Sequence, residues 1–287
     1  MKKIKILSLI LTALMIMCVM TGCGSSKGDN NSNITTDIST NPVGTTSINN
    51  TENIINASDD KYIYSKETFV EKMSALIDVS LYTLDENNSG TFSIYSYNIQ
   101  SDKKTATNLD CTVKIYDGTE ITMPISVKEF KNKGWNFKHN DSENNLGAGL
   151  LTFSAFENAD GKNLSADLFN STDRTVTFEE ATITGIESQQ YSTSDHNKKI
   201  EGALDFKVCN SITNDSSLVD IISVLGNPTS VICSISKESN GQYKYSKVTI
   251  KYEGSSSYNY LEFELSGDNN RILTMEYDCD VLALARK

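Results

Sequence analysis

The sequence predicts an α+β protein in which two tandem units, each a helix followed by an antiparallel meander, come after a disordered tether. The composition changes near residue 61, from a Ser/Thr/Asn-rich stretch to regular apolar patterns. Two amphipathic helical patterns occur in this later part, and alternating strand patterns bounded by Gly, Asn and Asp follow each of them. We therefore expect a signal peptide over 1–22, an acylated cysteine and tether over 23–60, and α+β units over 61–195 and 196–287.

The first residues are typical of an export signal. Three lysines precede an apolar run over 6–20, which is too short to cross a bilayer. The run ends in Met20-Thr21-Gly22-Cys23, which resembles the lipobox of bacterial lipoproteins, although Met20 stands where that family usually has Leu. The resemblance implies cleavage before Cys23 and a diacylglyceryl group on its thiol. The alternative is an ordinary secretory signal with a chance cysteine.

A lipid anchor on Cys23 would place the protein at the cell membrane, facing the extracytoplasmic side. Two acyl chains hold a protein stably where a single chain does not. The tether has too few apolar residues to offset its ordering entropy, and a flexible coil of its length reaches about 35 Å. Its Asn/Ser/Thr-rich composition, by analogy, favours a Gram-positive source.

The first unit is expected to begin with a helix over 65–81 capped by Ser65. Alternating apolar residues predict strands over 91–99 and 109–115. Ser126 and Glu129 form a capping box for a short helix that Gly134 ends, and Trp135 is expected to pack on the core. Further strands are expected over 150–156, 164–169 and 175–186.

The second unit repeats this order of elements. A strand over 203–208 precedes a helix whose stripe is Leu218, Ile221, Ile222 and Leu225. Strands over 231–235, 245–252, 260–265 and 271–277 follow. Residues 174–179 (RTVTFE) match 271–276 (RILTME) at three positions, which favours an internal duplication over a single irregular domain.

The second helix ends in Leu225-Gly226-Asn227-Pro228, where Gly stops the helix and Pro forbids its extension. This stop, followed by a meander, is similar to the β-lactamase-inhibitor-protein-like fold that small outer-membrane assembly lipoproteins share. The likeness covers 203–278 and, more weakly, 109–186. It implies two units that form one sheet gripping a protein partner. It carries no binding residue over to this chain and does not imply β-lactamase inhibition.

Charge and motif content argue against several classes of function. The formal net charge is −11, and loss of the three signal lysines would make it −14, which disfavours nucleic acid. His139 and His196 both lie in polar stretches, where we expect solvated loops. Catalytic, metal-binding and cofactor motifs are absent, and adjacent Glu179 and Glu180 would face opposite sides of a strand. We expect neither catalysis nor a metal or cofactor.

Four cysteines remain after the lipobox: Cys111, Cys209, Cys233 and Cys279. They allow three disulfide pairings. Because three of them fall on the apolar parity of their strands, we favour buried free thiols over disulfides.

The chain has thirteen Tyr against one Trp. Tyr alternating along strands can line a binding face, so the candidate binding residues are Tyr243, Tyr245, Tyr258 and Tyr260. The alternative is half-buried cover for a sheet.

The function that these features favour is a membrane-anchored extracytoplasmic lipoprotein that acts as a protein-binding or scaffold module at the cell surface. The alternative is a cell-wall glycan-binding protein, or a cell-wall hydrolase whose carboxylates come from separate strands. A solute receptor of a transporter is less favoured, because its alternating parallel β–α pattern is missing.

Overall fold

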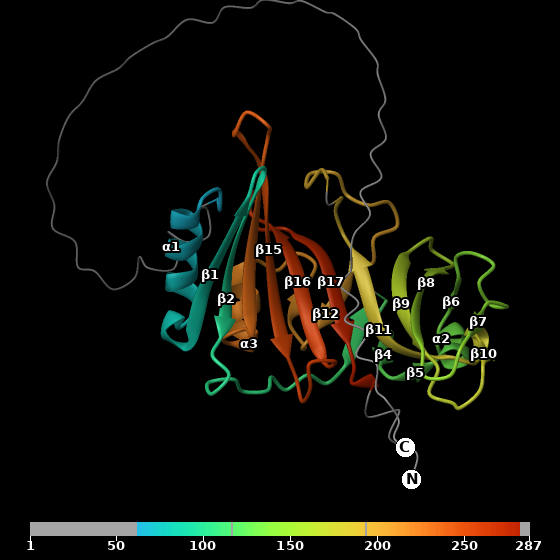
Figure 1. The fold of residues 1–287 in the computed structure, drawn as a ribbon. Helices are drawn as coiled ribbons and strands as arrows, with labels where there is room; N and C mark the ends of the chain where they lie inside the picture. The colour runs from blue at the N-terminus through green and yellow to red at the C-terminus, as the bar shows by residue number, and fades with distance from the viewer. Residues whose placement is uncertain (1–61, 116, 193, 282–287) are drawn as a thin grey trace, which may run out of the picture. The chain divides into compact units, whose positions relative to one another are not determined.

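The computed structural model describes residues 62–281, except 116 and 193 (Figure 1). The signal peptide, Cys23 and the tether lie outside the described residues. The helices are α1 (Lys66–Leu76), α2 (Val127–Asn132) and α3 (Leu218–Leu225). The strands are β1 (Tyr82–Ser89), β2 (Phe92–Ile99), β3 (Thr112–Ile115), β4 (Glu120–Thr122), β5 (Ile125–Ser126), β6 (Trp135–Phe137), β7 (Asn145–Leu146), β8 (Leu151–Asn158), β9 (Asn163–Phe169), β10 (Val176–Thr177), β11 (Thr182–Gln189), β12 (Phe206–Val208), β13 (Ile212–Thr213), β14 (Ser230–Lys237), β15 (Tyr243–Glu253), β16 (Tyr260–Ser266) and β17 (Ile272–Asp278).

The predicted fold class is wrong. The described residues are mostly antiparallel strands, and an eleven-stranded sheet runs in the order β1-β2-β14-β15-β16-β17-β11-β9-β8-β6, with β5 beside β11. This sheet is continuous across residue 195, because β2 pairs with β14 and β11 pairs with β17. The two segments thought to be duplicated differ as well. Residues 176–177 form a two-residue strand on β7, whereas residues 272–278 form a central strand of the large sheet.

One face of the large sheet is covered, and it holds the core. A second sheet of four strands, in the order β13-β12-β3-β4, shares a single cluster of buried side chains with α3 and the large sheet. At the β1–β2 end of the large sheet, Phe69 of α1 packs against Tyr95 and Tyr97 of β2. We call the covered face the inner face of the large sheet. In Figure 1, α3 and β12 lie behind β15–β17, so the opposite, outer face is toward the reader.

The predictions that depend on residues close together in the sequence, such as the helix caps and the end of α3, are confirmed. Ser65, Ser126 and Ser217 each accept a hydrogen bond from the first turn of their helices, and Gly226 ends α3 with φ of 75°. Trp135 is fully buried and stacks on Phe130. The first helix is shorter than predicted and ends at Leu76.

The cysteines differ from the expectation of free thiols. Cys111 and Cys279 form a disulfide, with their Cα atoms 6.1 Å apart across a sequence separation of 168 residues. Strand parity did not reveal this pair, because the fold brings the start of β3 to the end of β17. Cys209 and Cys233 are free, as expected. Burial raises the pKa of Cys209 to about 11 and that of Cys233 to about 12.

Candidate functional site

The outer face of the large sheet carries a group of carboxylates that the sequence analysis missed. Cross-strand register places Glu262, Glu276 and Glu187 in one row over β16, β17 and β11. Asp278 and Asp167 stand in the next row, on either side of Gly185. We call the outer side of these strands the acidic face, defined by Asp167, Glu187, Glu262, Glu264, Glu276 and Asp278.

Two lysines of β15 border the acidic face. Lys247 pairs with Glu264, and the ammonium of Lys251 lies 3.9 Å from a carboxylate oxygen of Glu262. In the part of the chain that the structure describes, the other four carboxylates form no salt bridge. The acidic face therefore has more negative groups than positive ones.

Gly185 lets two of the carboxylates meet. A Cβ at this position would lie 1.7 Å from Oδ1 of Asp278 and 2.9 Å from Oδ2 of Asp167. Because a side chain is missing there, the carboxyl groups of Asp167 and Asp278 come together. With Glu276 they offer three carboxylate oxygens that lie within 4.8 Å of one another. Such oxygens suit a hard divalent cation, but acidic groups also gather on surfaces without one.

Five carboxyl groups of the acidic face, those of Asp167, Glu187, Glu262, Glu276 and Asp278, hold protons more tightly than usual. Desolvation, followed by the charge of Asp167, raises the pKa of Asp278 to about 7. Desolvation also raises the pKa of Glu262 to about 7, although Lys251 opposes the shift. For Asp167, Glu187 and Glu276 the pKa is raised, again with desolvation as the first cause. The charge of the acidic face therefore changes with pH near neutrality.

The four tyrosines do not form a single patch. Tyr260 lies at the acidic face, where its hydroxyl donates to Glu276 and the ammonium of Lys251 sits 3.5 Å from its ring centroid. Tyr243 donates to Asp268, and Tyr245 packs edge-on against His196. Tyr258 is 50% exposed in the connection between β15 and β16, at the opposite end of β15 from Tyr243.

The two histidines have different environments. His139 is exposed, as predicted, whereas His196 is buried, so its predicted solvated position is wrong. Nδ1 of His196 lies 3.1 Å from Oγ of Ser266 on β16. Its neighbours Ser194 and Asp195 are polar, so the local sequence predicts a solvated loop. In the structure, the His196 ring instead holds the connection between β11 and β12 against the sheet.

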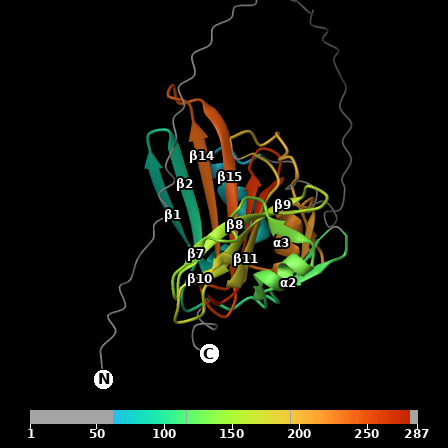
Figure 2. The same ribbon diagram turned by 90° about the vertical axis from the view of Figure 1, so that its right-hand side faces the viewer.

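Exposed apolar side chains border the acidic face on β8. Phe153 is 74% exposed and Leu151 is 54% exposed. Phe153 stands opposite Asp167 in the strand register, so it shares a face with the carboxylates. Figure 2 shows β8, β9 and β11 after a turn of 90°, with the right-hand side of Figure 1 toward the viewer.

A hollow of about 210 Å³ adjoins Glu187. Ala155 and Ser165 line it from β8 and β9, Gln189 lines it from β11, and Ile200 and Ala203 come from the following connection. Lys138 also reaches it, but its ammonium is held 2.9 Å from Oδ1 of Asn163. The hollow therefore combines apolar walls with the Glu187 carboxylate.

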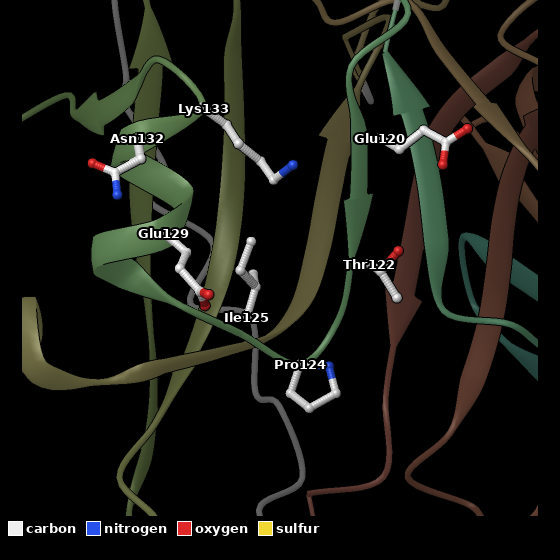
Figure 3. Close-up of a pocket in the computed structure, with 7 residues that line it drawn as sticks. All are labelled: Glu120, Thr122, Pro124, Ile125, Glu129, Asn132 and Lys133. Carbon is white, nitrogen blue, oxygen red and sulfur yellow. The ribbon is translucent and has the colours of Figure 1, made fainter.

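A larger groove of about 490 Å³ lies between β4 and α2 (Figure 3). Glu129 is turned back toward the start of α2, where it accepts from Ser126 in the capping box. Glu120, across the groove, pairs with Lys114. Both carboxylates of the groove have structural partners, whereas three carboxylates of the outer face converge, so we place the candidate site on the outer face.

No protein-family model, curated protein or solved structure matches the chain. Within the described range, no helix is both long and apolar enough to cross a membrane.

The acidic residues left one signal in the sequence. Glu262 and Glu264 are two residues apart on β16, and Glu276 and Asp278 are two residues apart on β17. This spacing puts the two members of each pair on the same side of their strand. Their meeting with Asp167 and Glu187 depends on which strands are neighbours, and this is a property of the tertiary fold.

Proposed function

We propose that this chain is a membrane-anchored extracytoplasmic lipoprotein that binds a protein partner through its acidic face, without catalysis. The observation that carries the proposal is a group of carboxylates, most of them without a salt bridge among the described residues, beside the exposed Phe153 and Leu151. Protein interfaces combine such apolar anchors with polar surroundings, and exposed apolar patches often mark binding sites. The anchor is the diacylglyceryl group expected on Cys23, and the tether would hold the folded part away from the membrane.

Glycan binding has less support. Sugars commonly stack on aromatic faces, and among the four candidate tyrosines only Tyr260 lies at the acidic face. Its ring is already occupied by the ammonium of Lys251.

A carboxylate-dependent cell-wall hydrolase is the second candidate, and one observation favours it. Asp167, Glu276 and Asp278 come from two strands and converge, as the sequence analysis required of such an enzyme. Asp278, with a pKa of about 7, would be protonated often enough to act as a general acid. Turnover of peptidoglycan that Asp278→Asn abolishes would establish this candidate and refute the non-catalytic proposal.

Site-specific photocrosslinking in intact cells tests the leading proposal. The full chain would carry p-benzoylphenylalanine in place of Phe153, and a matched chain would carry it in place of Tyr258, which is also exposed. We expect one dominant protein adduct from position 153 and none of that adduct from position 258. The same adducts from both positions, or none from position 153, would contradict binding at this face.

The anchor has its own test. Cys23→Ala should move the chain from the membrane fraction to the medium, and it should abolish labelling by a fatty-acid analogue. A chain that stays in the membrane fraction after this change would overturn the lipoprotein assignment.

A further inference from the structure

We infer that the acidic face binds an extended lysine- or arginine-rich segment of its partner, with one basic side chain in the hollow beside Glu187 and an apolar side chain on Phe153. This inference rests on the proposed function and names the chemistry of the partner.

Charge complementarity is the first argument. Lys247 and Lys251 pair with Glu264 and Glu262 at one border of the acidic face. No salt bridge among the described residues reaches Glu187, Glu276 or the two aspartates, so a cationic partner would supply the missing charge. Complementary potentials of this kind speed association and select partners.

The hollow is the second argument. Ala155, Leu164, Ile200 and Ala203 give it apolar walls, and Glu187 gives it a carboxylate. The ammonium of Lys138, which also lines the hollow, is held by Asn163. Lysine and arginine have the same two parts, an apolar stem and a charged head. Its volume of about 210 Å³ accommodates one long side chain.

The row of carboxylates is the third argument. Glu262, Glu276 and Glu187 stand on three neighbouring strands, and adjacent strands lie about 4.8 Å apart. A segment that crosses these strands therefore passes three carboxylates in about 10 Å. Phe153 lies two strands beyond β11, where it would meet an apolar residue of the same segment.

Other occupants fit less well. A second copy of this chain would oppose like charges, since the net charge is −11. A polyamine would satisfy the carboxylates but leave Phe153 and Leu151 exposed. A divalent cation would use only Asp167, Glu276 and Asp278, and would leave the hollow empty.

The test is fluorescence anisotropy with the purified full chain and labelled twelve-residue peptides at pH 8. One peptide alternates Lys with Leu, a second has Gln for every Lys, and a third has Ser for every Leu. We expect the first to bind at least ten times more tightly than the second, severalfold more tightly than the third, and more weakly as salt increases. Equal binding of the first and second peptides would overturn the inference.

Variants locate the binding. Glu187→Gln with Glu276→Gln should weaken the Lys peptide at least tenfold, and Phe153→Ser should weaken it severalfold. Glu238→Gln, an exposed carboxylate on the β14–β15 connection, is the matched control and should leave affinity within twofold. An equal loss in this control would refute binding at the acidic face. Urea unfolding of each variant verifies that it is folded.

Two outcomes separate this inference from the proposed function. If photocrosslinking from position 153 captures a protein but the Lys peptide does not bind, the protein-binding proposal stands and the cationic segment is wrong. If calcium binds the chain, Asp278→Asn abolishes its binding and the Lys peptide does not bind, the acidic face is a metal site, and the inference is again overturned.

Discussion

Asp278 of β17 and Asp167 of β9 meet above Gly185 of β11, and their carboxyl groups bring oxygens within 4.8 Å of each other across a strand that has no side chain at this point. Two carboxyl groups this close do not both ionise readily, so the pair retains a proton that isolated aspartates lose. This relationship makes the protonation of the acidic face sensitive to a single backbone position.

Gly185→Ala should break the pair. The new Cβ would meet Oδ1 of Asp278, a side-chain end that can rotate away, so the chain should still fold and lose about 1 kcal/mol of stability at pH 5. The pKa of Asp278 should fall from about 7 toward its ordinary value. Carboxyl ¹³C NMR titration measures this shift, and an unchanged titration would show that the two aspartates do not depend on Gly185 for their contact.

Stability should fall as pH rises from about 4 to 7. The folded-state pKa values of Asp278 and Glu262 are about 7, above their unfolded values, so the folded state binds more protons in this window. Allowing for partial solvent screening, the two groups together should lower the unfolding free energy by about 3 kcal/mol between these limits. Urea unfolding at a series of pH values measures the slope.

Asp278→Asn and Glu262→Gln should flatten that pH dependence, because each removes one group whose ionisation opposes folding. Glu238→Gln is the control and should leave the slope unchanged. A stability that rises with pH through this window in the parent chain would contradict the raised pKa values.

The disulfide should contribute substantially to stability. It closes a loop of 168 residues, and the loss of such a crosslink costs about 3–5 kcal/mol through the entropy of the unfolded chain. The double change Cys111→Ser and Cys279→Ser should show this loss in urea unfolding. Cys209→Ser, at a half-buried free thiol, should cost much less. Peptide mapping without reductant should recover the 111–279 linkage, and recovery of both cysteines alkylated would refute it.

His196 should be structural. Its ring is buried against Tyr245 and hydrogen-bonded to Ser266, so His196→Ala should lower the unfolding free energy by about 2 kcal/mol. His139→Ala, at an exposed position, should change it by less than 0.5 kcal/mol, as surface substitutions do. A loss from His196→Ala as small as the loss expected from His139→Ala would contradict a structural role for the buried ring.

Prediction from sequence succeeded where neighbours in the chain decide the structure. Ser126 and Glu129 are three residues apart, and each satisfies the other's backbone group at the start of α2. Strand β1 was missed for the opposite reason. Its residues Tyr82–Ser89 are mostly exposed and polar, and hydrogen bonds to β2 hold them in a strand.

The sequence by itself determined the helix caps, the inward parity of most strands and the acidic balance, because these depend on spacing of a few residues. Only the tertiary structure decided that β17 pairs with β11 and that β11 pairs with β9. That order brings Asp278, Gly185 and Asp167 together, as it also brings Cys279 to Cys111. Hydrogen bonds between strands join backbone groups that are alike in every residue, so strand order follows from the packing of the whole core rather than from any local pattern.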